Sequence, residues 1–251
     1  MLVTSLKTPQ PPTSLKILHY LQPRMPLQVE DKINIQNLNK GVIGERKFFQ
    51  ILKDNLLVDC LILYGLNLEV DQTEFQIDCL MIFQNDIMLI EVKNYNGDFY
   101  VKDDSWYSVA TGNEIRNPIH QIKRSEILFR KLLKQLGYKY SVKASIVFIN
   151  KEFFLYQAPL DQSLIFPNQI QRFINKLNNM TSKITKKHEN IANQLVKQLL
   201  PISSHERLPK YNYDQLKKGI VCNSCQKFLK VLSRTNLWCD QCNKEENVDS
   251  A

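Results

Sequence analysis

The sequence predicts a mixed α/β fold with a small cysteine-rich module at its C-terminal end, and three observations support this prediction. Apolar residues at helical spacing alternate with strand-like apolar runs between about residues 41 and 150. A polar helical stretch rich in Asn and Lys follows, from about residue 168 to 200. Two C-x2-C pairs then lie close together, between residues 222 and 242. We therefore expect two folded parts of unequal size.

Composition and charge narrow the function classes only slightly. The chain of 251 residues is 43% hydrophobic and 23% charged, which is ordinary for a protein with a packed core. Its net charge of +8 permits attraction to phosphate, but such a balance is common among proteins that bind no nucleic acid. No stretch reaches about 18 apolar residues, and the first residues lack the apolar run of a signal peptide, so we expect a cytoplasmic protein that contacts no membrane. Reduced thiols there favour metal binding over disulfides.

Two helices and several strands are predicted in the larger part. Residues 41–54 have the apolar spacing of an amphipathic helix, and Asn117-Pro118 with Gly137 brackets a second helix at residues 118–136. Strand-like runs occupy residues 75–84, 86–95, 97–114 and 141–150. The first two of these runs are predicted to form one hairpin.

The register of this hairpin decides which charged residues lie together. If Asn85 and Asp86 form a two-residue loop, Leu80 lies opposite Glu91, and Asp78 lies opposite Lys93. Directly paired residues share a face, so the two acids and the lysine project the same way. The other face is then apolar, formed by Ile77, Cys79, Met81, Phe83, Met88, Ile90 and Val92. We expect a core on one face and a charged cluster on the other.

Two neighbouring carboxylates offer the hard oxygen ligands that Mg²⁺ prefers, and a bound divalent ion lowers the pKa of its water. A nearby lysine can position that water or offset charge on a phosphoryl group. The same residues are compatible with solvated charges at the end of a strand, which is a common arrangement. Spacing alone leaves both interpretations open.

Four short motifs add a family resemblance. They are GVIGE at 41–45, QID at 76–78, IEVKNYNG at 90–97 and NPIHQ at 117–121. With these motifs in this order, the chain from about 40 to 150 resembles the nuclease-related domain (NERD) family, which is similar to the PD-(D/E)xK nucleases. The resemblance implies a restriction-endonuclease-like mixed sheet flanked by helices.

The resemblance also assigns roles to individual residues. It implies that Asp78 and Glu91 hold Mg²⁺ or Mn²⁺, that Lys93 is the catalytic lysine, and that Glu45 is the acid of the first helix. Gln121 takes the place of the helical glutamine, and its alternative role is a buried amide that only bonds the end of a strand. The cations of the same helix could approach phosphates or form an ordinary solvated face; they are Lys123, Arg124, Arg130, Lys131 and Lys134.

The cysteine module is predicted to bind a structural zinc ion. Two C-x2-C pairs on either side of a hairpin can complete a tetrahedral shell, formed by Cys222, Cys225, Cys239 and Cys242. Four protein ligands leave no open position, so the site is expected to be structural. Some bacterial NERD proteins end in a similar module. Cys60 and Cys79 lie in apolar strands and are expected to be core residues.

Cations in this module suggest contact with nucleic acid. Lys227, Lys230 and Arg234 accompany Trp238, which could stack on a base or pack over the zinc site.

The complete interpretation has four segments: residues 1–38 an N-terminal arm, 39–158 a nuclease-like domain, 159–210 a helical linker and 211–251 a zinc ribbon. The predicted function is Mg²⁺-dependent hydrolysis of phosphodiester bonds in nucleic acid, with DNA as the expected substrate. A non-catalytic nucleic-acid-binding or adaptor protein is the alternative, and a protein-interaction module is a third possibility.

Overall fold

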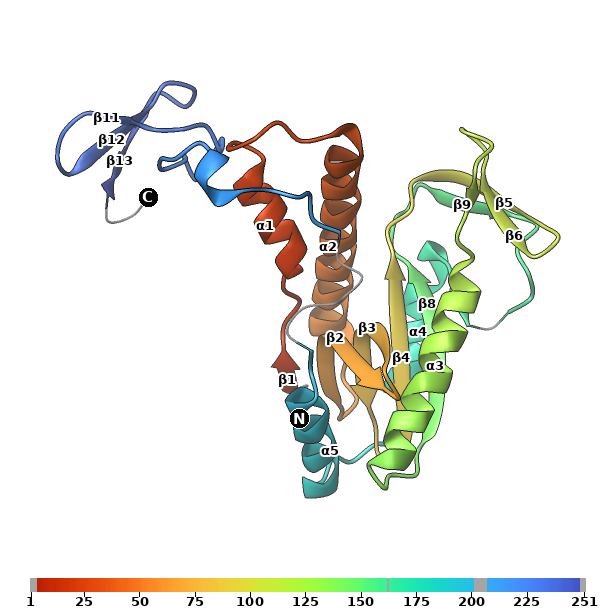
Figure 1. Cartoon of the computed structure of the whole chain (residues 1–251). Coiled ribbons are helices and arrows are strands. Elements are labelled where there is room, and N and C mark those ends of the chain that lie inside the picture. Colours follow the sequence, from red (N-terminus) through yellow and green to blue (C-terminus); the bar gives the residue numbers. More distant parts are fainter. Residues whose placement is uncertain (1–3, 162, 201–206, 249–251) are drawn as a thin grey trace. The chain divides into compact units, whose positions relative to one another are not determined.

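The computed structural model describes residues 4–161, 163–200 and 207–248 (Figure 1). The chain divides into two compact units. The first comprises Met1–Gln10 with Lys40–Ser204, and the second comprises Pro11–Asn39 with His205–Ala251.

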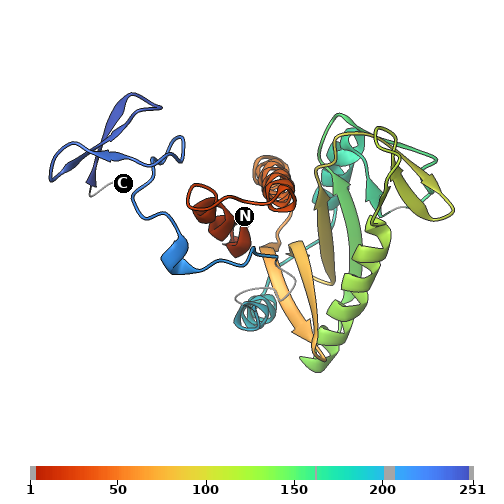
Figure 2. The same ribbon diagram turned by 45° about the horizontal axis from the view of Figure 1, so that its top comes forward.

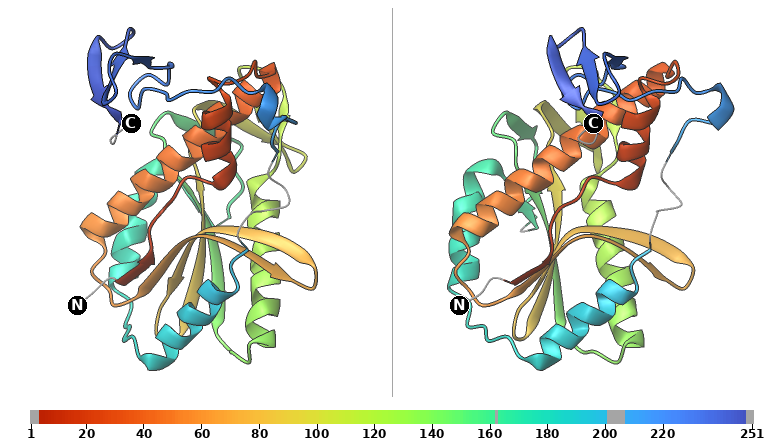
Figure 3. Two further views of the ribbon diagram at one scale, coloured as in Figure 1. Left: turned by 60° about the vertical axis from the view of Figure 1, so that its left-hand side comes forward. Right: turned by 90° about the vertical axis from the view of Figure 1, so that its left-hand side faces the viewer.

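The first unit is built on a six-stranded mixed sheet in the order β1-β2-β3-β4-β8-β10. Its strands are β1 (Thr4–Lys7), β2 (Leu61–Val70), β3 (Thr73–Ile82), β4 (Asp86–Lys93), β8 (Ser141–Phe148) and β10 (Leu164–Ile165). β2, β3 and β4 are antiparallel neighbours, whereas β1 pairs with β2, β8 with β4, and β10 with β8 in parallel. Figure 3 shows the strong twist of these strands, with the helix α3 (Pro118–Gln135) running beside them.

Helices cover both faces of this sheet. α3 and α5 (Lys186–Lys197) pack on one face through residues such as Phe129 and Ile191. α2 (Val29–Asn55) and α4 (Ile170–Asn178), the latter preceded by a 3-10 turn at Pro167–Gln169, pack on the other. Figure 2 shows α2 and α3 on opposite sides of the sheet. The mixed α/β architecture predicted from the sequence is confirmed.

A second, smaller sheet follows directly from β4. It has the order β7-β6-β5-β9, formed by β5 (Gly97–Lys102), β6 (Ser105–Ser108), β7 (Glu114–Ile115) and β9 (Phe153–Tyr156). Its inner face buries Trp106 completely, and Phe153 stacks on Phe148 of β8 with ring centroids 4.2 Å apart. These aromatic contacts fix the small sheet against the end of the large one.

The second unit contains α1 (Thr13–Leu21), the first part of α2 and a small zinc-ribbon-like sheet. A 3-10 turn at Tyr213–Gln215 precedes that sheet, which consists of β11 (Lys230–Val231), β12 (Asn236–Cys239) and β13 (Lys244–Asn247). α1 buries the apolar residues Leu15, Leu18 and Leu21.

The hairpin register predicted from the sequence is wrong by two residues. Leu80 pairs with Leu89, and Ile82 pairs with Ile87, so the loop is longer than the predicted Asn85-Asp86 turn. The N–H of Phe83 donates to the carbonyl of Asp86 and closes this loop at 2.8 Å. Because the slip is even, the side chains of the paired residues 79–82 and 87–90 keep their predicted alternation between the two faces.

The expected division into one apolar and one charged face is also wrong. Leu80 and Leu89, on the face expected to be charged, are fully buried beneath α3. Ile77 belongs to that same cluster, whereas Cys79 and Met81 pack on the opposite face. Central strands of a sheet covered on both sides must be apolar on both faces. Charged side chains on β3 and β4 therefore lie outside the paired stretch of residues 79–82 and 87–90.

Two other elements differ from the sequence interpretation. The helix predicted at residues 41–54 begins at Val29, because the polar residues before Gly41 continue it. The segment predicted as a linker supplies β10, α4 and α5 to the first unit, where Phe173 and Leu195 are core residues. β2 was not identified from the sequence, although Leu66, Leu68 and Val70 alternate as expected for a strand.

Candidate functional site

The strand ends bring Asp78 and Glu91 together. Cys79 pairs with Ile90, so the next residues outward on β3 and β4 are these two acids. Asp78 is held in place because its Oδ2 accepts the backbone N–H of Val92 at 2.8 Å. Glu91 is 4% exposed and lies on the same face as Lys93, two residues further along β4. The structure thus places these three predicted residues in one cluster.

Gln121 of α3 joins this cluster through two hydrogen bonds. Its Nε2 donates to Glu91 Oε1 at 2.6 Å, and its Oε1 accepts from Lys93 Nζ at 3.2 Å. Lys93 Nζ also donates to Glu91 Oε1 at 2.7 Å, which closes a triangle of three side chains. An amide bonded in this way has only one orientation that satisfies both partners. Gln121 therefore fixes the rotamers of the acid and the lysine.

The position of Gln121 is set by how α3 begins. Asn117 caps the helix, because its Oδ1 accepts the N–H of Ile119 at 2.9 Å. Its Nδ2 donates to the carbonyl of Asp104 at 2.8 Å, which ties the helix start to the β5–β6 turn. Pro118 occupies the first helical turn, where its missing N–H costs nothing. Gln121 follows within that turn, facing the ends of β3 and β4.

Glu45 reaches the site because α2 passes very close to the end of β4. A Cβ atom added to Gly44 would lie 2.8 Å from Asn94 Cβ and 3.4 Å from Ile149 Cγ2. Asn94 also donates from Nδ2 to the carbonyl of Lys40 at 2.8 Å. The missing side chain of Gly44 permits this approach, and the Asn94 amide holds it.

Asn94 and Gly44 are functional candidates that the sequence interpretation missed as individual residues. Both lie inside the motifs at 41–45 and 90–97. Their role is to set the distance between a helix and a strand, and the spacing of residues in one sequence does not indicate such a role. Asn94 Oδ1 is buried and has no hydrogen-bond partner among the described residues.

Negative charge is concentrated at this site. Burial, followed by the nearby Glu91 carboxylate, raises the pKa of Glu45 to about 7. Burial, and then Glu91 and Glu45, raise the pKa of Asp78 well above its usual range. Burial lowers the pKa of Lys93, but the Glu91 carboxylate and other neighbours outweigh it and raise the pKa overall. One lysine faces three carboxylates, so the site favours a further cation.

The donor set fits a hard divalent cation held by few protein ligands. Asp78 Oδ1 and Glu91 Oε2 have no hydrogen-bond partner in the described part of the chain, and carboxylate oxygens suit Mg²⁺ or Mn²⁺. The three acids do not form a set of ligand atoms lying within 4.8 Å of one another. An ion would therefore be bound by two carboxylates and complete its shell with water or substrate oxygens.

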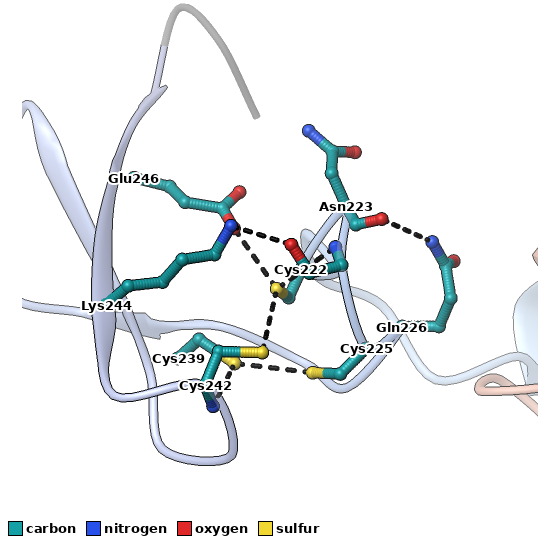
Figure 4. Close-up of polar contacts among 9 residues, drawn as sticks. Cys222, Asn223, Cys225, Gln226, Cys239, Cys242, Lys244 and Glu246 are labelled. Atoms are coloured by element: carbon teal, nitrogen blue, oxygen red, sulfur yellow. Dashed lines mark hydrogen bonds and ion pairs between the residues drawn. The ribbon is translucent and has the colours of Figure 1, made fainter.

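The cysteine cluster has the geometry of a closed metal site. The ligand atoms of Cys222, Cys225, Cys239 and Cys242 all lie within 4.8 Å of one another. Figure 4 shows the four sulfur atoms gathered between the two knuckles, with Glu246 and Lys244 beside Cys222. Backbone N–H groups of Ser224 and Cys242 donate to the Sγ atoms of Cys222 and Cys239, each at 3.4 Å.

The two knuckles also have matching backbones. Gln226 and Asn243 each follow the second cysteine of a pair, and both have positive φ, at 59° and 49°. This conformation turns the chain back toward the cluster. Cys60 and Cys79, in contrast, are completely buried in the apolar core of the first unit, as expected.

Most of the basic face predicted on α3 is occupied by ion pairs. Lys123 lies 4.0 Å from Asp161, Arg130 lies 2.5 Å from Glu126, and Lys131 pairs with Asp71. Arg124 and Lys134 have no such partner among the described residues. The structure therefore favours the solvated-face interpretation for this helix.

One of the predicted ribbon cations is also held in an ion pair. Lys230 pairs with Asp240 at 2.6 Å, and Trp238 lies directly across the ladder from Lys230, half-buried.

Comparison with known proteins gives one family match. Residues 40–149 match the family model of the nuclease-related domain. A crystal structure of protein VC1899 from Vibrio cholerae is similar at 14% identity, with a TM-score of 0.29 over 66% of this chain. The chain spans 50% of that protein's length. No curated protein matches the chain. Within the described residues, no helix has both the length and the apolar character needed to span a membrane.

Proposed function

We propose that this protein is a metal-dependent nuclease that hydrolyses phosphodiester bonds of nucleic acid, with DNA as its substrate. One observation carries the proposal. Asp78, Glu91 and Lys93 converge at a buried strand end, inside the stretch that matches the nuclease-related domain. A buried acid pair beside a lysine is costly for stability, which supports a functional reason for the arrangement.

In this proposal Asp78 and Glu91 would hold Mg²⁺ or Mn²⁺. The bound ion would supply an activated water and offset charge on the phosphoryl group. Lys93 donates hydrogen bonds from a nearly buried ammonium, so it can orient a water or a phosphate oxygen without leaving Glu91. Gln121 keeps both side chains in place, and Glu45 accepts a proton or holds an outer water from the α2 side.

We further propose that the four cysteines bind one structural zinc ion. Four thiolates close the shell, so this site would stabilise the ribbon and take no part in hydrolysis. A cytoplasmic location agrees with this role, because zinc binding requires reduced thiols.

The proposal is tested by incubating the purified protein with single- and double-stranded DNA and RNA, in Mg²⁺, in Mn²⁺ and without divalent ions. Cleavage that requires the ion and is lost in Asp78→Asn supports it. Glu69→Gln removes an exposed carboxylate from β2 and is the matched control, which should cut like the parent. Absence of cleavage under every condition would remove the enzyme assignment.

A non-catalytic nucleic-acid-binding protein is the second candidate. Glu91 Oε1 is already engaged by Lys93 and Gln121, and the three acids form no compact ligand set. A protein of this kind would bind nucleic acid in the same experiment without cutting it. A pure protein-interaction module would do neither.

A further inference from the structure

A segment of the second unit carries a large excess of positive charge. Residues 207–234 contain seven Lys or Arg residues and one acidic residue, Asp214, whereas the whole chain has a net charge of +8. All seven cationic side chains are exposed; they are Arg207, Lys210, Lys217, Lys218, Lys227, Lys230 and Arg234. Such a concentration attracts polyanions and costs stability through repulsion.

Backbone pairing brings three of these lysines onto one edge of the ribbon. The N–H of Leu229 donates to Ile220 at 2.9 Å, and the N–H of Cys222 donates to Lys227 at 2.8 Å. Lys217 and Lys218 immediately precede this pairing, and Lys227 lies at its other end. Lys227 lies opposite Cys222, so with a strand rise of about 3.3 Å per residue Lys218 and Lys217 are roughly 13 Å and 17 Å away from it along the chain. Several phosphates of one nucleic-acid strand occupy that length.

Arg24 joins the same edge from the end of α1. Its Nη2 donates to the carbonyl of Gly219 at 3.1 Å, and its guanidinium lies 5.7 Å from the ring centroid of Phe228. The N–H of Lys217 donates back to the Arg24 carbonyl at 3.0 Å. These contacts fix the lysine-bearing segment and add a fourth positive charge.

The lysines on this edge are not paired with carboxylates of the described residues. In the described ranges, no carboxylate lies within 4.0 Å of Lys217, Lys218 or Lys227, in contrast to Lys230, which pairs with Asp240. Lys218 donates to the carbonyl of Tyr213 and lies 3.2 Å from the centroid of its ring. Tyr213 is 70% exposed, so an aromatic face lies beside the cations. Cations beside an exposed aromatic ring are typical of surfaces that contact nucleic acid.

We propose that the edge formed by Arg24, Lys217, Lys218 and Lys227, here named the ribbon basic edge, binds the phosphate backbone of nucleic acid. It anchors the chain on its substrate independently of the acidic cluster in the first unit. The choice of nucleic acid as the partner rests on the proposed nuclease function, but binding by this edge requires no cleavage. Two weak contacts joined in one chain bind more tightly than either contact alone.

The test uses the full chain carrying Glu91→Gln, in Mg²⁺, with fluorescent DNA of about 20 nucleotides, single- or double-stranded, measured by anisotropy. Lys217→Gln, Lys218→Gln and Lys227→Gln are combined in one variant. The matched control removes three exposed lysines of the first unit, Lys53, Lys176 and Lys197, each near the end of its helix. Zinc content and thermal unfolding confirm that each variant is folded.

The ribbon variant should lose about tenfold or more in affinity, and the slope of log K against log salt should fall by up to about three, because each lost phosphate contact removes about one unit. The control should stay within about twofold, and the corresponding Lys→Arg triple should bind like the parent. An equal loss in both Gln variants, or in neither, overturns the proposal.

The outcome is separable from the nuclease assignment. In the chain with Glu91 intact, losing the ribbon basic edge should raise KM and leave kcat unchanged. Cleavage that persists with an unaltered KM would contradict the anchoring role and leave the nuclease intact. DNA binding that depends on the lysines in a protein that never cuts would support the anchor and exclude the enzyme.

Discussion

At the scale of single residues, the site combines buried acids with a lysine that they hold charged. Glu91 and Lys93 have side-chain exposures of 5% and 16%, so neither charge is well solvated. Removing one partner of such a pair leaves the other charge unpaired, which typically costs about 3–5 kcal/mol. Ala at position 91 would therefore mix catalytic and structural effects. Glu91→Gln keeps the shape and a hydrogen-bonding group, and it is the sharper test.

Glu45 provides a prediction about pH. Its pKa is raised from 4.5 to about 7, so the folded state binds more protons than the unfolded state between these pH values. Stability of the protein without divalent ions should therefore fall as pH rises from 4.5 to about 7, by an amount on the order of 3 kcal/mol. Glu45→Gln should reduce this fall and stabilise the protein at pH 8, and the part of the fall that remains is expected from Asp78, whose pKa is also raised.

Urea unfolding at pH 5 and pH 8 in Mg²⁺-free buffer measures this effect, and Glu69→Gln serves as the control because its carboxylate is exposed. Adding Mg²⁺ at pH 8 should restore stability to the parent more than to Glu45→Gln. If the parent is as stable as Glu45→Gln at pH 8, the ionised Glu45 carboxylate does not destabilise the folded protein.

At the scale of elements, the approach of α2 to β4 determines whether Glu45 belongs to the site. Gly44 makes the approach possible, and Asn94 completes it with a hydrogen bond to Lys40. Gly41 lies one turn earlier on the same helix, and a Cβ added there would meet nothing within 4 Å. The two glycines are a matched pair with opposite expectations.

Gly44→Ala should destabilise the protein and lower its activity, because the new Cβ must displace Asn94 or the helix. Gly41→Ala should stabilise the protein by about 0.5–1 kcal/mol and leave activity unchanged, because Ala favours helix over Gly. Thermal unfolding and cleavage rates of both variants measure this difference. Equal behaviour of the two would show that the close approach has no consequence.

Much of this arrangement could be predicted from the sequence. Local signals sufficed for α3, because Asn117-Pro118 and Gly137 mark its ends, and for the cysteine module, because its spacing is specific. The grouping of Asp78 with Glu91 survived a wrong hairpin register only because the slip was even.

Other features depend on contacts between distant parts of the chain. The contact between Gly44 and Asn94, and the packing of α4 and α5 into the core, join segments that no local pattern connects. The polar start of α2 carries no apolar periodicity, so its true length was also hidden.

At the scale of the whole molecule, two units carry two different kinds of site. The first has an apolar core on both faces of a sheet and acids at one end. The second has a short three-stranded sheet with few buried apolar residues, which include Leu237. A core of this size contributes little stability by itself, which supports the zinc ion proposed for this module.

We expect about one zinc ion per chain, measured by elemental analysis of reduced protein. Its removal should unfold the ribbon and leave the first unit folded. The two tryptophans separate these effects, because Trp106 is buried in the first unit and Trp238 lies on β12. In Trp106→Phe, chelation should shift the emission of Trp238 to the red, whereas in Trp238→Phe the emission of Trp106 should stay constant. Freshly reduced protein without zinc would contradict the assignment.

The most direct test of the central claim compares DNA cleavage by the parent and by Glu91→Gln in Mg²⁺, with thermal unfolding of both proteins measured alongside. The parent should cut only with the ion. The variant should remain folded, and its cleavage rate should fall by more than the factor of about 10–100 that is typical of losing an outer contact to a metal site. If the folded variant cuts as fast as the parent, cleavage does not arise from the cluster of Asp78, Glu91 and Lys93.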